Sequence, residues 1–255
     1  MGSRQLWIGT SWKMNKVRAE ARSFASTLAA STIIRHEGVQ PFIIPPFTSI
    51  AEVAGLLASS RVRVGAQNMH WADAGAWTGE ISPLMVKDAG ATLVELGHSE
   101  RRTYFGETDE TVALKAAAAL KHGLTPLVCV GETRAEFDAG RTAEVLARQA
   151  AAALSKIAQE HRTGTILLAY EPVWSIGEGG TPAEPPFVNM QHALIKQQTE
   201  RSIGRSLPVL YGGSVNPDNC REFAAQSNVD GLFIGRSAWA AEGYLGILQS
   251  VAATL

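Results

Sequence analysis

The 255-residue chain contains only two cysteines, Cys129 and Cys220, which are too few for a disulfide framework. Cys129 lies inside the apolar run "PLVCVG", a context that favours a small buried thiol over a bridged one. Such sparse use of cysteine fits a reducing compartment. We therefore expect a cytoplasmic protein.

An excess of charge of one sign is also missing. Lys and Arg total 23 against 24 Asp and Glu, so the formal net charge is -1. Such a chain has no global field that attracts nucleic acid or an anionic membrane surface, and neither is expected as a partner. No apolar run approaches the length of a bilayer span, and the first residues lack the apolar region of a signal peptide.

Linkers, low-complexity stretches and breaks in composition are absent too, which predicts a single domain over residues 1–255. No spacing of His, Cys, Asp and Glu resembles a zinc or calcium site. The glycine-rich segment 177–180 lacks the Lys-Ser/Thr tail of a P-loop. We expect neither a metal nor another cofactor.

What the chain has in abundance is short apolar runs rich in β-forming residues, many of them continuous rather than alternating, which suits parallel strands covered on both faces. Stretches with helical apolar spacing or many alanines lie between them, including residues 18–31, 110–123, 143–161 and 242–255. The predicted strands are residues 6–10, 41–45, 62–66, 92–97, 126–131, 165–171, 208–213 and 231–235.

About eight strand and helix units in one chain of this length predict an α/β protein with a (β/α)₈ barrel, with an open doubly wound sheet as the alternative. Barrels of this kind keep their chemistry at the carboxyl ends of the strands. Titratable residues recur at that end, namely Lys13, His98, Glu100, Glu132 and Glu171. Burying several charges on one face requires a shared ligand or a mutual network, so this end is the predicted active site.

Glycine-rich strand ends indicate a phosphate site. They are "IGEGG" at 176–180, "YGGSV" at 211–215 and "IGRS" at 234–237. Glycine lets backbone N–H groups approach an anion, and the start of a following helix adds a favourable dipole. The last two stretches follow the predicted strands seven and eight, where such barrels often bind phosphate. The alternative is that these glycines only form tight turns.

Eight motifs together resemble the triosephosphate isomerases, in order and spacing, over essentially the whole chain. They are "SWKMN", "GAQNMHW", "TGEIS", "ELGHSERR", "CVGET", "AYEPVWSIG", "YGGSV" and "DGLFIG". The resemblance implies a TIM barrel that isomerises a small phosphorylated sugar by enediol proton transfer without a cofactor. It implies Glu171 as the general base, His98 as a neutral electrophile and Lys13 as the stabilising cation, as is established for this family.

The resemblance also implies roles for supporting residues. Residues 172–182 would be a lid that excludes water, as in the family. Glu100 would position the active-site lysine, and Thr78, on the apolar segment 68–82, would reach the neighbouring subunit of a homodimer. The phosphate cradle would be formed by Gly177, Ser214, Gly235 and Arg236.

Three positions depart from the usual family pattern. Ser11 stands where Asn is usual, the lid tip reads "GEGG", and Arg236 replaces a glycine. This combination is similar to a branch that interconverts L-erythrulose 1-phosphate and D-erythrulose 4-phosphate in erythritol breakdown. Replacing Asn by Ser would free volume for the extra hydroxymethyl group of a four-carbon substrate. The alternatives are an ordinary triosephosphate isomerase of glycolysis, which acts on dihydroxyacetone phosphate, and a barrel that binds a sugar phosphate without turnover.

Overall fold

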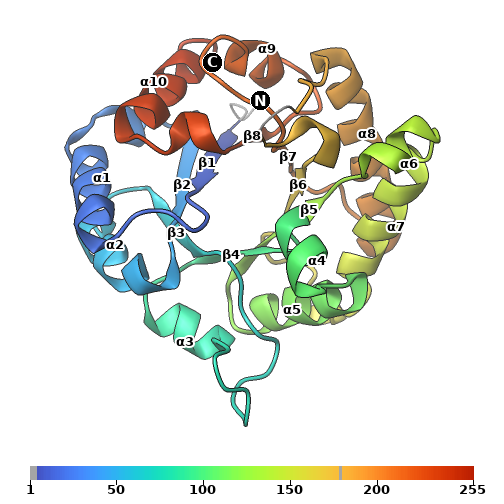
Figure 1. Cartoon of the computed structure of the whole chain (residues 1–255), viewed down its shortest axis with the longest axis horizontal. Coiled ribbons are helices and arrows are strands. Elements are labelled where there is room, and N and C mark those ends of the chain that lie inside the picture. The colour runs from blue at the N-terminus through green and yellow to red at the C-terminus, as the bar shows by residue number, and fades with distance from the viewer. Residues whose placement is uncertain (1–4, 178–179) are drawn as a thin grey trace.

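Strands and helices alternate along the whole computed structural model, which describes residues 5–177 and 180–255. Within those residues, eight parallel strands close into a barrel in chain order, because the last strand pairs with both its predecessor and the first. The predicted (β/α)₈ barrel is confirmed (Figure 1). The strands are β1 Leu6–Ser11, β2 Val39–Ile44, β3 Arg63–Ala66, β4 Leu93–Leu96, β5 Thr125–Val130, β6 Leu167–Tyr170, β7 Val209–Tyr211 and β8 Gly231–Ile234.

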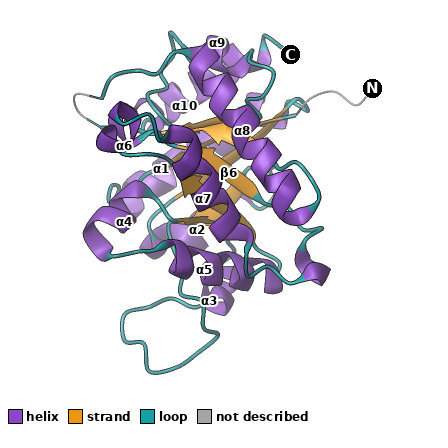
Figure 2. Cartoon of the chain, turned by 90° about the vertical axis from the view of Figure 1, so that its right-hand side faces the viewer, coloured by secondary structure: helices purple, strands orange, loops and turns teal. Residues whose placement is uncertain are grey.

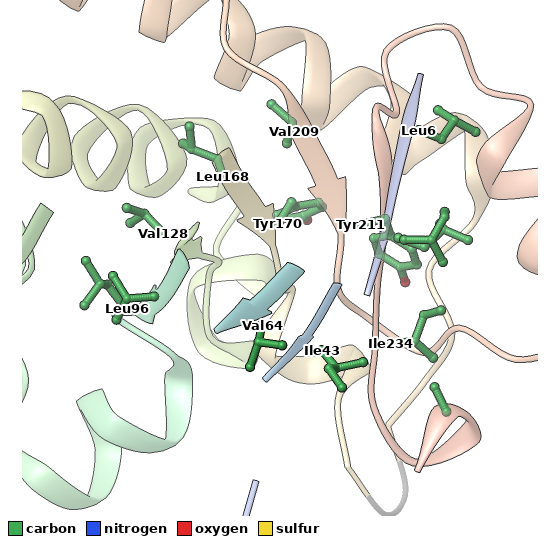
Figure 3. Packing of buried hydrophobic residues seen from close by; sticks show 14 of the residues in the cluster. Leu6, Ile43, Val64, Leu96, Val128, Leu168, Tyr170, Val209, Tyr211 and Ile234 are labelled. Atoms are coloured by element: carbon green, nitrogen blue, oxygen red, sulfur yellow. The ribbon is translucent and has the colours of Figure 1, made fainter. Parts of the chain in front are cut away.

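The continuous apolar character of the strands follows from burial on both faces. In β2, Phe42 and Ile44 belong to the cluster inside the barrel, whereas Ile43 between them belongs to the larger cluster under the helices. Figure 3 shows side chains of this outer cluster, contributed by strands from around the barrel. Alternate residues of a strand therefore face the interior and the helices, as the two-residue period requires.

The helices circle the barrel in chain order until α10 lies next to α1 (Figure 1). None of those in the described ranges is long and apolar enough to cross a membrane. The α-helices are α1 Arg18–Ala30, α2 Ile50–Leu57, α3 Pro83–Asp88, α4 Ser99–Phe105, α5 Asp109–Lys121, α6 Arg134–Asp138, α7 Thr142–Leu154, α8 Pro185–Ile203, α9 Cys220–Ala224 and α10 Ala241–Ala252.

One predicted helix is shorter than expected. The Ala-rich stretch 143–161 forms α7 only as far as Leu154, and a separate 3₁₀ turn covers Gln159–His161. The backbone N–H of Ser155 bonds to the Ala152 carbonyl oxygen, which tightens the last turn, and Ile157 is then buried in the core. The helix thus ends so that the chain can return to β6, and helical propensity alone does not predict this helix end.

Candidate active site

A cavity of about 280 Å³ opens at the carboxyl ends of the strands. It brings together most of the residues predicted from the sequence, although they come from segments distant in the chain. Those that line it are Ser11, Lys13, His98, Glu171, Gly177, Ser214, Gly235 and Arg236.

Lys13 follows β1 with a backbone φ of 54°, a left-handed conformation that is rare for a residue with a side chain. The Gln67 side chain donates a hydrogen bond of 2.8 Å to the Lys13 carbonyl oxygen. At the other end of the residue, Nζ lies 2.6 Å from Oε1 of Glu100. Both ends of Lys13 are therefore held, and its cation is fixed at the edge of the cavity.

His98 precedes α4 as its N-cap residue, and its Nδ1 accepts the backbone N–H of Glu100 at 3.1 Å. The proton of the neutral ring is therefore on Nε2. Burial, reinforced by the charge of Lys13, lowers the pKa of His98 to about 4. At neutral pH the ring is an uncharged hydrogen-bond donor, and Nε2 lies 3.7 Å from Oε2 of Glu171.

Glu171 directly follows β6, and its backbone N–H bonds to the Val130 carbonyl oxygen at 2.8 Å. Its side chain is buried, and Oε2 has no hydrogen-bond partner among the residues that the structure describes. Gly212 makes room for it, because a Cβ there would lie 2.6 Å from Cγ of Glu171. Burial and the nearby charge of Glu95 raise the pKa of Glu171 to about 8, which makes the ionised carboxylate a strong base.

Glycine-rich turns form the opposite side of the cavity. Gly212 and Gly213 follow β7, Gly235 follows β8, and all three line the cavity with little side-chain bulk. The backbone N–H of Ser214 bonds to Oγ of Ser175 at 3.4 Å, which links this turn to the segment after β6. The arrangement leaves room for an anion beside the titratable groups.

The predicted lid, residues 172–182, includes Glu178 and Gly179, which lie outside the described residues. Its first part is held by Glu132, which accepts hydrogen bonds from Trp174 Nε1 at 2.7 Å and from the Tyr170 hydroxyl at 3.1 Å. Glu132, a strand-end candidate for the active site, is buried but does not line the cavity. Its carboxylate faces the start of the lid, so the prediction of a direct site role is wrong for this residue.

Two supporting residues lie outside the cavity lining. Glu100 contacts both Lys13 and His98, as a positioning residue would. Thr78 is exposed on the loop between β3 and α3, which projects from the barrel (Figure 2). A single chain therefore does not bring Thr78 to the site.

Some residues at or near the site were not identified as site residues from the sequence. Phe233, Asn216 and Trp239 line the cavity. Glu95 and Cys129 are buried, and the charge of Glu95 raises the pKa of Glu171. The signal for Glu95 was available, because a carboxylate in the middle of the apolar run "TLVELG" is unusual. Within residues 5–177 and 180–255, no group of three or more His, Cys, Asp or Glu side chains is placed to hold a metal ion.

Comparison with known proteins gives consistent matches over nearly the full chain. The model of the family described as triosephosphate isomerase matches residues 6–251. A protein of Rhizobium rhizogenes named L-erythrulose-1-phosphate isomerase is 57% identical over 99% of this chain and 97% of its own length. Proteins of the same name from Rhizobium etli and Brucella abortus are 58% and 56% identical, over 98% and 97% of this chain and 94% and 97% of their own lengths.

Proposed function

The chain belongs to the triosephosphate isomerase family, and from this membership we propose that it interconverts L-erythrulose 1-phosphate and D-erythrulose 4-phosphate. One observation carries the chemistry: the buried Oε2 of Glu171 lies 3.7 Å from Nε2 of His98 in a cavity bounded by glycine-rich turns. The same observation argues against a barrel that only binds sugar phosphates, because binding alone requires no base.

Glu171 is the base in this proposal. Its carboxylate removes the proton from carbon 3 of L-erythrulose 1-phosphate, the C–H electrons form a double bond between carbons 2 and 3, and the carbonyl oxygen on carbon 2 takes up negative charge. The same carboxyl then returns the proton to carbon 2. The oxygen on carbon 3 becomes the new carbonyl, and the phosphate stays where it was.

His98 and Lys13 act on the negative charge that develops on the two oxygens of the substrate. The neutral imidazole of His98 donates from Nε2 and transfers a proton between the oxygens, as in the family. Lys13, held by Glu100, stabilises the negative charge of the enediolate. These donors are already oriented, so little reorganisation is needed as the charge forms.

The phosphate is bound by backbone N–H groups of Gly177, Ser214 and Gly235, with the exposed Arg236 at the rim of the same cavity. The φ of 84° at Gly177 favours glycine at this position. Closure of segment 172–182 over the phosphate would then exclude water from the base, as in the family.

Two observations support a four-carbon substrate over a three-carbon one. The relatives that match this chain at 56–58% identity carry the name of the tetrulose phosphate isomerase. Ser11, smaller than the Asn usual in the family, lines the cavity beside the catalytic groups. We therefore propose a role in erythritol catabolism rather than in glycolysis.

We expect kcat/KM to be higher for L-erythrulose 1-phosphate than for dihydroxyacetone phosphate. A hydroxymethyl group that fits its pocket is worth roughly 10- to 200-fold. Ser11→Asn refills the space and should narrow or reverse this preference, whereas Ser11→Ala keeps the space open. Steady-state kinetics of all three proteins on both substrates in one buffer tests this. A wild-type protein that turns over the triose at least tenfold better would be an ordinary triosephosphate isomerase.

We also propose a homodimer formed through segment 68–82. Trp77 is 51% exposed there, and its ring centroid lies 4.5 Å from that of His70. An exposed tryptophan on a projecting loop suits a pocket on a second copy, to which Thr78 would then contribute.

Light scattering at micromolar concentration should give twice the mass of the chain. Trp77→Asp should shift the protein toward monomers, because a charge at the centre of an apolar interface is costly. Met190→Asp is the matched control, since Met190 is similarly exposed, at 54%, but lies on α8, across the barrel from this loop (Figure 1). A fully active wild-type monomer would exclude the dimer.

We propose that residues 1–255 act as one catalytic domain, because the family model spans 6–251 and the barrel closes between β1 and β8. The cytoplasmic location remains a prediction from the sparse use of cysteine.

A further inference from the structure

Trp239 lies at the seam where the barrel closes. β1 and β8 pair from Trp7 to Thr10, so their ladder ends one residue before Ser11. Beyond that point, the chain after β8 forms a 3₁₀ turn at Arg236–Ala238, and Trp239 follows it. Ser11 and Trp239 both line the cavity, and Trp239 has the largest side chain of the described residues that do so. The two residues therefore belong to one stretch of the cavity wall, just beyond the end of the ladder.

A hydrogen bond of 2.9 Å joins these two residues, which are 228 positions apart in the chain. The indole Nε1 of Trp239 donates to the backbone carbonyl oxygen of Ser11. On the other side of β1, the next backbone N–H, that of Trp12, donates to the carbonyl oxygen of Ile44 at 3.1 Å. The end of β1 is thus held from β2 by the backbone and from the chain after β8 by the indole. This contact also fixes the position of the indole ring at the seam.

Ser11 faces the interior of the barrel. It lies on β1 two residues after Gly9, where an added Cβ would collide with the ring of Phe42, a member of the apolar cluster inside the barrel. The two-residue period of a strand places Ser11 on the same inner face. Its hydroxyl therefore lies on the cavity side of β1, next to the indole that is bonded to its carbonyl oxygen.

The hydrogen bond determines what Trp239 can offer to a ligand. An indole has one N–H donor and no acceptor, and here the donor is used by the Ser11 carbonyl oxygen. The rest of the ring is apolar carbon. The cavity wall at the seam therefore combines an apolar surface from Trp239 with the hydroxyl of Ser11. Such a wall suits a CH₂OH group, which has an apolar carbon and a hydroxyl of its own.

We propose that Trp239 is a specificity-determining residue, whose ring forms with Ser11 the wall that the extra hydroxymethyl group of the four-carbon substrate contacts. The inference rests on the proposed function. In L-erythrulose 1-phosphate a CH₂OH group is attached to the carbon that loses its proton, and dihydroxyacetone phosphate has a second hydrogen in its place. Only the four-carbon substrate therefore carries the group that reports on this wall.

The test compares kcat/KM for the two substrates in the full-length protein. Trp239→Leu removes most of the wall and should lower the tetrulose-to-triose ratio about tenfold, at the lower end of the range for one group in a fitted pocket. The loss should come mainly from a higher KM for the tetrulose, because the contact is made equally in the ground state and the transition state. A merely structural role would instead lower kcat/KM for both substrates alike.

Trp239→Phe tests the hydrogen bond separately. Phenylalanine keeps an aromatic ring but lacks the N–H that holds the ring to Ser11, so the ratio should lie between those of the wild type and Trp239→Leu. Should Trp239→Leu fail to fold, Trp239→Met carries the same expectation with an unbranched side chain.

Two controls accompany these variants. Trp7→Leu removes a tryptophan from the same seam, where Trp7 pairs with Gly231 at the other end of the ladder, and should leave the ratio unchanged. Inhibition by inorganic phosphate reports on the glycine-rich turns alone. Its inhibition constant should be the same in the wild type and in Trp239→Leu.

The outcomes separate the two proposals. A wild-type protein that prefers the triose overturns the proposed substrate. A wild-type preference for the tetrulose that survives Trp239→Leu or Trp239→Met overturns the role of Trp239 alone, as do equal losses on both substrates or weaker inhibition by phosphate. A wild-type ratio in Trp239→Phe overturns the part assigned to the hydrogen bond.

Discussion

Glu171→Gln is expected to reduce kcat by about 10²- to 10⁴-fold, the range for removing a general base. The amide keeps the size of the side chain but cannot accept the proton from carbon. Glu171→Asp keeps the carboxylate but withdraws it by about an ångström, for which a loss on the order of 100-fold is expected. Steady-state rates at saturating substrate measure kcat for both variants and for the wild type.

Thermal unfolding separates this loss from misfolding. The pKa of Glu171 rises from an ordinary value near 4.5 to about 8 in the folded protein, so the folded state binds the proton more tightly than the unfolded chain. The resulting stabilisation is present below about pH 4.5 and is lost as the pH rises through 8. The Gln variant has no such loss. The difference obtained by subtracting the wild-type Tm from the Tm of the Gln variant should therefore increase between pH 5 and pH 9. A folded Gln variant with wild-type kcat would remove Glu171 from the role of base.

Lys13→Ala is expected to reduce kcat/KM by about 10²- to 10³-fold, the range for removing one group that stabilises a developing oxyanion. Lys13 lines the cavity, and its ammonium is fixed 2.6 Å from Glu100. Without it, the enediolate has no cation beside it and the Glu100 carboxylate loses its partner. Initial rates on L-erythrulose 1-phosphate measure the effect.

Lys16→Ala is the matched control. Lys16 belongs to the same loop and also has a positive φ, 74°, so both substitutions put alanine in a strained conformation. Its Nζ, however, lies 5.4 Å from the ring centroids of Trp12 and Phe24. Lys16→Ala should therefore keep nearly full activity. Equal losses in the two variants would assign the effect to the strained loop instead of the cation.

The barrel could be predicted from the sequence because its strands are buried on both faces. Runs such as "PFIIP" and "PLVCVG" have no polar alternation, and that property follows from the layered architecture itself. Helix ends were less predictable. The end of α7 at Leu154 depends on where Ile157 is buried, which is a tertiary contact.

The same contrast holds at the site. Strand-end positions identified Lys13, His98 and Glu171, because parallel strands bring their carboxyl ends to one end of a barrel. That rule could not distinguish Glu132 from Glu171, because each of them lies within two residues of the end of a strand. The difference is one of side-chain direction: Glu132 faces Trp174 and Tyr170, and Glu171 faces His98.

The fold class, the order of the elements and the residue types gathered at one end of the barrel could be predicted from the sequence, because they follow from local periodicity and from chain order. Three properties instead depend on tertiary contacts: which nitrogen of His98 carries its proton, how basic Glu171 is, and that the Glu95 carboxyl is buried near Glu171. Hydrogen-bond direction and desolvation depend on groups that close packing brings together from distant segments, and no window of sequence contains them.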